Sequence, residues 1–121
     1  MFGLYLMGLP RYLRLTHADD FARVRREGRV LRHKLLLVSI APNTVGHNRY
    51  GIVTAKKIGK AYQRNRVRRV LRETLRLQHP YLQAGFDVVL VAHAGAVDAA
   101  WPVIQATVEA LFQQAGLMAV E

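Results

Sequence analysis

The side chains best suited to chemistry gather in one stretch, residues 56–76, which reads KKIGKAYQRNRVRRVLRETLR. Nine of its residues are Lys or Arg, and Glu73 is its only acid. Like charges at i,i+4 destabilise a helix by about 0.2–0.5 kcal/mol per pair, so this density calls for a compensating anion. Most of these cations are arginines, whose planar guanidinium binds phosphate through two hydrogen bonds. The segment is therefore typical of a surface that binds nucleic acid.

Helical periodicity divides this stretch into an apolar arc and a cationic arc. We expect a helix over residues 62–78, ending before Pro80 because the residue preceding a proline is disfavoured in helical backbone. The arc expected to face the core holds Val67, Val70, Leu71, Thr74, Leu75 and Leu77. The opposite arc and its borders hold Arg64, Asn65, Arg66, Arg68, Arg69, Arg72 and Arg76.

Two other roles for the cationic arc are weaker. A solvated face that serves only solubility normally mixes charges of both signs. A membrane-bound amphipathic helix would need its apolar arc for lipid, and here the core needs that arc. Nucleic acid remains the favoured partner.

The approach to this helix, TAKKIGKAYQ, superficially resembles a nucleotide-binding P-loop. Thr54 stands where the first glycine is required, and Ala61 replaces the Ser or Thr that would hold magnesium, so we exclude NTP hydrolysis. What remains is a turn at Gly59 that leads into a helix N-terminus, where the helix dipole favours phosphate. The cations Lys56, Lys57 and Lys60 flank this turn.

No catalytic constellation accompanies the basic segment. The chain has no cysteine, which excludes disulfides, thiolate metal sites and thiol nucleophiles. Its five histidines lack metal-ligand spacing, and its only serine, Ser39, lies inside an expected strand. We predict no catalytic residue and no metal site on the protein itself.

Length and charge bound the remaining possibilities. The 121 residues suffice for one domain, and 18 Lys and Arg against 8 Asp and Glu give a net charge of +10. No apolar run is long enough to span a bilayer, and the absence of cysteine fits a cytoplasmic address. We expect one RNA-binding domain over residues 1–121, with residues 1–9 as a disordered extension.

Local patterns predict the other elements. Thr16 and Asp19 resemble a capping box for a first helix over about 17–27, with Gly28 as its stop. Residues 30–41 and 49–55 read as two strands of an antiparallel hairpin, and residues 86–92 as a buried central strand. A last helix is expected from residue 98 or 99 to about residue 115, ended by Gly116. The pattern predicts a single α+β domain.

The run KKIGKAYQRNRVRRVLRE closely resembles the signature of the bacterial ribonuclease P protein component, through its Lys-Lys, Gly-Lys-Ala, Arg-Asn-Arg and Arg-Glu groups. RLTHADDFARVRREG is similar to the family's first helix, RYGIVTAKK to the strand entering the signature, and FDVVLVA to its last strand. The resemblance covers most of the chain outside the first nine and last few residues.

The resemblance implies a fold and a function. The fold would be a two-layer α-β-β-β-α-β-α sandwich with a left-handed βαβ crossover, including a short first strand over about 28–31. The protein would bind a catalytic RNA, one protein per RNA, and the 5′ leader of precursor tRNA. The holoenzyme would remove that leader by hydrolysis, with Mg²⁺ held mainly by the RNA, and the protein alone would be inactive.

The resemblance also assigns site residues. The RNA subunit would be bound by Lys56, Lys57, Lys60, Arg64, Asn65, Arg66, Arg68, Arg69, Arg72 and Arg76. A cleft between the first helix and the sheet would bind the leader through Arg14, Phe21, Arg25 and Val38. Arg25 and Val38 depart from the family pattern, which favours aromatic residues there, so leader binding would depend more on charge. Phe21 could equally be a core residue.

Two other classes remain open on sequence grounds. One is a structural or ribosomal RNA-binding protein of similar fold, and the other is a free-standing nuclease. Cleavage of precursor tRNA by the protein alone would favour the nuclease. A protein with no effect on the catalytic RNA would favour the structural class.

Overall fold

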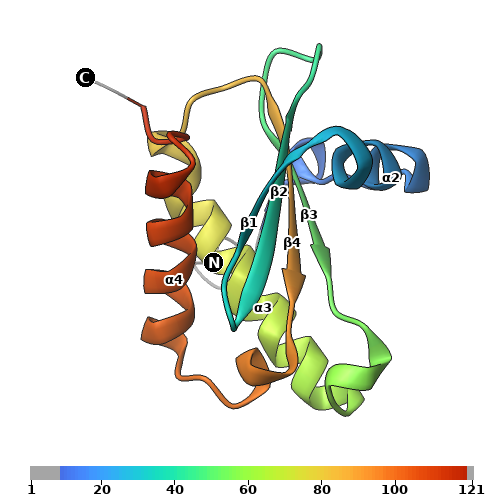
Figure 1. Cartoon of the computed structure of the whole chain (residues 1–121), viewed down its shortest axis with the longest axis vertical. Helices are drawn as coiled ribbons and strands as arrows, with labels where there is room; N and C mark the ends of the chain where they lie inside the picture. The colour runs from blue at the N-terminus through green and yellow to red at the C-terminus, as the bar shows by residue number, and fades with distance from the viewer. Residues whose placement is uncertain (1–8, 120–121) are drawn as a thin grey trace.

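The computed structural model describes residues 9–119, and its elements follow the predicted α-β-β-β-α-β-α order (Figure 1). The three α-helices are α2 (Ala18–Glu27), α3 (Ala61–Gln78) and α4 (Trp101–Gln114). The four strands are β1 (Arg29–Arg32), β2 (Leu36–Pro42), β3 (Arg49–Val53) and β4 (Phe86–Ala92). Short 3-10 turns lie at η1 (Arg11–Leu13), η2 (Lys56–Ile58), η3 (His79–Tyr81) and η4 (Ala94–Val97).

The strands form one mixed sheet in the order β1-β2-β4-β3. β1 pairs antiparallel with β2, β2 antiparallel with β4, and β3 parallel with β4. The predicted hairpin of residues 30–41 with 49–55 is therefore wrong, because β4 lies between β2 and β3. The predicted central position of residues 86–92 is confirmed.

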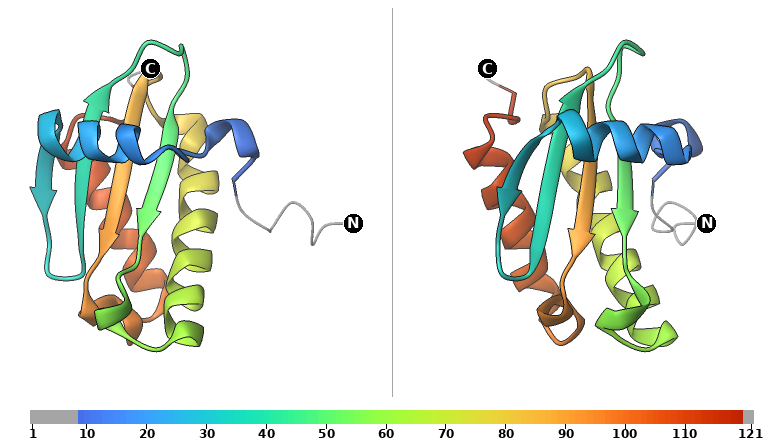
Figure 2. Two further views of the ribbon diagram at one scale, coloured as in Figure 1. Left: turned by 90° about the vertical axis from the view of Figure 1, so that its right-hand side faces the viewer. Right: turned by 45° about the vertical axis from the view of Figure 1, so that its right-hand side comes forward.

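The connection from β3 through α3 to β4 is left-handed. Seen from the α2 side, β3 and β4 both run downward, α3 passes behind the sheet, and β4 lies to the left of β3 (Figure 2). Nearly all parallel βαβ connections have the opposite hand. The unusual hand expected from the resemblance is confirmed, and it places α3 beside the β3 edge of the sheet.

Helices cover both faces of the sheet (Figure 1). α3 and α4 pack on one face and enclose the main core, in which alternate strand residues such as Leu36, Tyr50 and Leu90 are buried. α2 crosses the other face at one end, over a smaller cluster that includes Leu15, Val24 and Val89. Leu9 is also buried in the main core, so the folded part includes this last residue of the expected extension, and residues 1–8 lie outside the described part.

Helix α2 begins and ends differently from the sequence prediction. Its N-cap is His17, without a side-chain cap hydrogen bond, so the predicted capping box of Thr16 and Asp19 is wrong. Gly28 does end the helix, through a hydrogen bond from its N–H to the Val24 carbonyl. A Cβ on Gly28 would lie 2.3 Å from that carbonyl oxygen, which explains the glycine by close approach.

The later helices agree with prediction at most positions. In α3 the expected core residues Val67, Val70, Leu71, Thr74 and Leu75 are buried. Leu77 is 47% exposed, so its predicted core position is wrong. α4 begins at Trp101, two or three residues later than expected, and Gly116 follows it with a left-handed φ of 72°.

Candidate nucleic-acid interface

The arginines predicted to bind RNA lie on the side of α3 that turns away from the core, and the three predicted lysines lie on the turn that leads into this helix. Lys56, Lys57, Lys60, Asn65 and Arg69 are exposed, and the other five predicted residues are half-buried. Within residues 9–119, Arg76 is the only member of this set that forms a salt bridge, with Glu73 at 2.5 Å. The positive charge of the remaining cations is therefore not balanced by an acid of the described chain.

Three arginines one turn apart form the border of α3 that faces β3. Arg68 donates from Nε to Thr54 Oγ1 at 3.1 Å and from Nη1 to Asn65 Oδ1 at 3.0 Å, which orients its guanidinium. Arg64 Nε is buried and has no hydrogen-bond partner within residues 9–119. Burial and the charges of Arg14 and Arg68 lower the pKa of Arg72. The side chains thus concentrate positive potential along one edge of the helix.

Arg66 lies on the opposite border of the helix. Its guanidinium donates to the carbonyls of Val97, at 3.5 Å, and Ala99, at 3.2 Å, and so connects α3 to the segment before α4. Gln63 accepts a hydrogen bond from the Lys60 N–H at 2.8 Å and caps the helix start. Of the predicted RNA-binding residues, Arg66 is thus engaged with backbone of the η4 region.

A small cleft joins the cationic edge of α3 to the start of α2. It has a volume of about 190 Å³, and its lining includes Arg14, Phe21, Gly51 and Arg72. The chain before α2 forms its outer wall, because Leu15 donates its N–H to the Tyr50 carbonyl at 2.8 Å beside β3. The structure thus brings together Arg14 and Phe21, predicted for the leader, and Arg72, predicted for the RNA subunit.

Phe21 lies directly on the backbone of β3. A Cβ built on Gly51 would come within 2.4 Å of Phe21 Cε1, so the glycine leaves room for the ring. The ring also packs against the small cluster under α2 while lining the cleft. Phe21 is therefore partly a core residue and partly a cleft residue, the two alternatives that the sequence left open.

The structure corrects the prediction for Val38. This side chain is 0% exposed and belongs to the main core beneath α3 and α4, on the face of the sheet opposite α2. The predicted leader contact of Val38 is therefore wrong. Its neighbour Leu37 is half-buried on the α2 side and pairs in register with Val91 of β4. Strand alternation places Leu37, Val91 and Val53 on that face, beyond the part that α2 covers.

Arg25 is exposed on α2 and forms no hydrogen bond or salt bridge with residues 9–119. Arg32, exposed on β1, pairs in register with Leu37 and lies on the same face of the sheet. The α2 side of the sheet therefore combines half-buried apolar side chains with free guanidinium groups. Sequence reasoning missed Leu37 and Arg32, although a period of two along each strand could have found them.

A buried carboxylate, Asp87, lies at the α2 end of β4. It is 0% exposed and accepts hydrogen bonds from Arg49 at 2.9 and 2.8 Å, from Asn43 at 2.8 Å and from Arg23. Burial opposes its ionisation, but the hydrogen bonds from Arg49 and Asn43 and the charges of Arg49 and Arg23 outweigh burial and lower the pKa of Asp87.

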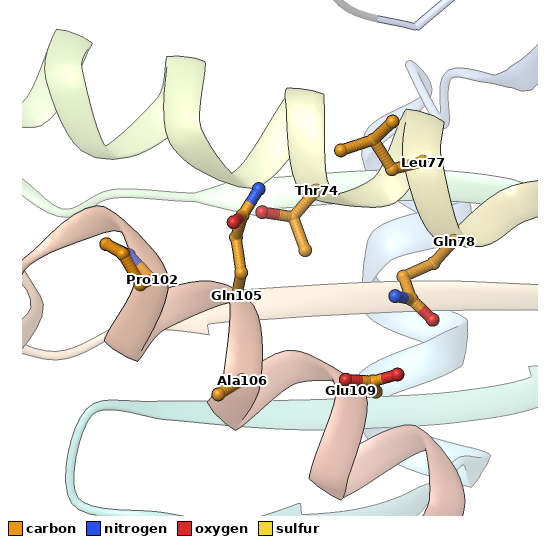
Figure 3. A pocket seen from close by; sticks show the side chains of 7 residues that line it. All are labelled: Thr74, Leu77, Gln78, Pro102, Gln105, Ala106 and Glu109. Carbon is orange, nitrogen blue, oxygen red and sulfur yellow. The ribbon is translucent and has the colours of Figure 1, made fainter.

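Two other cavities among residues 9–119 contain none of the predicted site residues. One groove of about 300 Å³ lies between α3 and α4, where Thr74 and Gln78 face Gln105 and Glu109 (Figure 3). Among residues 9–119, no three His, Asp or Glu side chains lie close enough together to hold a metal ion. No helix in this part of the chain is long and apolar enough to cross a membrane.

The fold and the site together define a class: a small α+β domain in which a left-handed crossover presents an arginine-rich helix beside a cleft. A family model described as Ribonuclease P matches residues 9–116. The chain therefore belongs to the ribonuclease P protein family, whose members are protein components of the ribonucleoprotein that processes tRNA.

Individual relatives agree with this assignment. The ribonuclease P protein component of Herpetosiphon aurantiacus is 43% identical over 109 residues, covering 90% of this chain and 89% of that one. That of Synechocystis is 35% identical over 114 residues, covering 93% and 92%. Among solved structures, the Staphylococcus aureus protein matches with a TM-score of 0.82 at 26% identity, over 88% of this chain and 98% of that one. The Thermotoga maritima protein matches with a TM-score of 0.76 at 27% identity, over 84% and 96%.

Proposed function

We propose that this protein binds the catalytic RNA of ribonuclease P through the cationic side of α3 and binds the 5′ leader of precursor tRNA beside α2. The observation that supports this most strongly is the set of arginines and lysines on and before α3, of which only Arg76 has an acidic partner in the described chain. A phosphate backbone supplies the missing negative charge, and releases bound counterions when it does so. One protein per RNA is the stoichiometry we propose.

The contacts with the RNA subunit are mainly phosphate contacts. Arg64, Arg68 and Arg72 follow one another at intervals of four residues, so they form a row along the helix. Lys56, Lys57 and Lys60 extend the positive charge to the N-terminus of α3, where free backbone N–H groups favour anions. Such groups position an RNA without reading its sequence.

The leader is proposed to lie across the α2 side of the sheet. Phe21 offers part of a ring for base stacking, and Leu37, Val91 and Val53 offer an apolar floor. Arg14 and Arg25 supply positive charge at the side of this surface. Because Arg25 stands where the family favours an aromatic residue, contact with the leader depends more on phosphate here.

The chemical step is proposed to belong to the RNA. The α3 surface offers guanidinium and ammonium groups, whereas Mg²⁺ prefers carboxylate, carbonyl and phosphate oxygens, so the magnesium ions fit the RNA rather than this surface. When bound there, Mg²⁺ supplies activated water and stabilises the leaving oxygen. The protein contributes binding and charge neutralisation, acts in the cytoplasm, and is inactive alone.

Reconstitution tests the proposed function. Precursor tRNA is incubated with the protein alone, with the catalytic RNA alone and with both, at a magnesium concentration at which the RNA alone is slow. We expect cleavage at the mature 5′ end only, or much faster, when both are present. Cleavage by the protein alone would identify a free-standing nuclease. An RNA whose activity does not respond to the protein would indicate a structural RNA-binding protein.

A further inference from the structure

We infer that Arg23, held by the buried carboxylate of Asp87, is a positioning residue that sets the place of α2 over the sheet and thereby the affinity for the leader. The inference rests on the proposed leader binding beside α2. Neither Arg23 nor Asp87 is itself proposed to touch RNA. Their part is to fix the helix that presents Phe21 and Arg25.

The apolar contact between α2 and the sheet is thin. Val24 is the only buried residue of the helix, and Phe21 is the only other α2 side chain in the small cluster beneath it. Apolar contacts are non-directional, so two side chains hold a helix against a sheet without fixing its rotation or slide. Another interaction is needed to define where α2 lies.

The ion pairs at the end of β4 are directional interactions that define the position of α2. Asp87 accepts hydrogen bonds from Nε and Nη2 of Arg49 in β3, and its Oδ2 also accepts from Arg23 of α2. Arg23 donates in addition to the Pro42 carbonyl of β2, at 3.3 Å. Hydrogen bonds that a guanidinium donates through two nitrogens have a strong geometric preference. Arg23 thus connects α2 to β2 and β4, while the shared carboxylate connects it to β3.

Charge balance supports a positioning role rather than a phosphate contact for Arg23. Asp20 Oδ1 lies 3.9 Å from Arg23 and 3.7 Å from Arg49, so two carboxylates face two guanidinium groups within the cluster. Arg23 is therefore neutralised inside the molecule, unlike Arg25 two residues later on the same helix. Its effect on RNA must pass through the position of α2.

The test compares precursor tRNAs with long and one-nucleotide leaders, bound to the holoenzyme reconstituted with wild-type or variant protein. Arg23→Gln removes the ion pair between α2 and Asp87 but leaves the hydrogen bonds between Arg49 and Asp87. We expect it to lower the preference for the long leader by about three- to tenfold, with unchanged affinity for the catalytic RNA. Because a displaced α2 also moves Arg25, the salt dependence of leader binding is compared in an Arg25→Gln background, where Arg23→Gln should leave the slope unchanged. Loss of a direct contact between Arg23 and a single strand would reduce that slope by about 0.7.

Two further variants separate the position of the charge and the hydrogen bonding of Arg23 from the loss of charge alone. Arg26→Gln removes the same charge from an exposed position of α2 whose partner is only its neighbour Glu27, and it should retain the wild-type preference. Arg23→Lys keeps the charge without the two-branched hydrogen bonding, and should fall between wild type and Arg23→Gln. Urea unfolding shows that each variant is folded at the assay temperature.

The outcomes separate the inference from the function on which it rests. If wild-type holoenzyme does not prefer the long leader, leader binding by this surface is refuted and the inference with it. If wild type shows the preference and Arg23→Gln behaves like Arg26→Gln, the positioning role is overturned while the proposed function stands. If Arg23→Gln lowers the salt slope by about 0.7 in the Arg25→Gln background, Arg23 is instead a direct phosphate contact, which also overturns the positioning role.

Discussion

At the scale of single residues, Asp87 is a carboxylate that is completely buried in the fold. A fully buried carboxylate is costly unless charged hydrogen bonds replace its water, and Arg49, Asn43 and Arg23 provide them. Both arginines remain partly exposed, so the cluster is open to solvent on one side. Asp87 therefore stabilises the fold only while it is ionised.

The pKa of Asp87 gives a pH prediction with a defined sign. Because its pKa is lower in the folded chain than in the unfolded chain, its contribution is complete above the ordinary carboxyl value of about 3.9 and is lost as the pH falls through the lowered value. At neutral pH, Asp87→Asn should cost about 1–3 kcal/mol in free energy of unfolding. Below about pH 4 the wild type should lose stability faster than the variant.

Urea unfolding at a series of pH values from neutral to strongly acidic measures this difference. The two stability curves should converge as the pH falls. Parallel curves would show that Asp87 contributes nothing through its charge, and would also weaken the case that it holds Arg23 in place.

At the scale of elements, strand register decides which residues lie on the α2 side of the sheet, where the leader is proposed to bind. Leu37 and Val38 are neighbours on β2, but one is half-buried on the α2 side and the other is fully buried in the main core. A shift of one residue moves every side chain of a strand to the other face. The register observed here defines a matched pair of substitutions.

We predict that threonine affects leader binding at one of these positions and stability at the other. Leu37→Thr should weaken binding of a long-leader precursor with little loss of stability, because its side chain contributes to the apolar floor. Val38→Thr should cost about 1–3 kcal/mol of stability by burying a hydroxyl, and should leave leader affinity unchanged in the folded protein. Affinity and urea unfolding measured on both variants check this. The reverse pattern would mean that the register is misassigned.

The elements also show what sequence can and cannot predict. The bounds of α3 and β4 follow from hydrophobic periodicity and from Pro80, because both signals are local. The hairpin of β2 with β3 was predicted from adjacency in sequence, but pairing depends on β4, which follows α3 in the chain. Predicting which face of the sheet Val38 occupies requires the strand register. Predicting the role of Asp87 requires knowing that Arg23 and Arg49 reach it from other elements. Residues distant in sequence determine the strand pairing, the face on which Val38 lies and the ion pairs of Asp87.

At the scale of the whole molecule, the distribution of charge explains why this fold holds a net charge of +10. The described salt bridges gather around Asp87, at the end of α2 and at Arg76, so most of the α3 cations remain outside them. The left-handed crossover puts that helix beside β3, next to the cleft that contains Phe21. In the function proposed above, one side of the molecule would meet two RNA strands, the RNA subunit along α3 and the leader beside α2.

The salt dependence of binding to the catalytic RNA tests this account most directly. Alanine at Arg64, Arg68 and Arg72 removes three charges from α3, and alanine at Arg26, Arg29 and Lys34 removes three exposed charges from elsewhere. The slope of log affinity against log salt should fall by up to about three for the α3 variant, since each phosphate contact contributes a slope near one. It should stay close to wild type for the control. An α3 variant with the wild-type slope would show that the RNA lies against another surface, and would contradict the account.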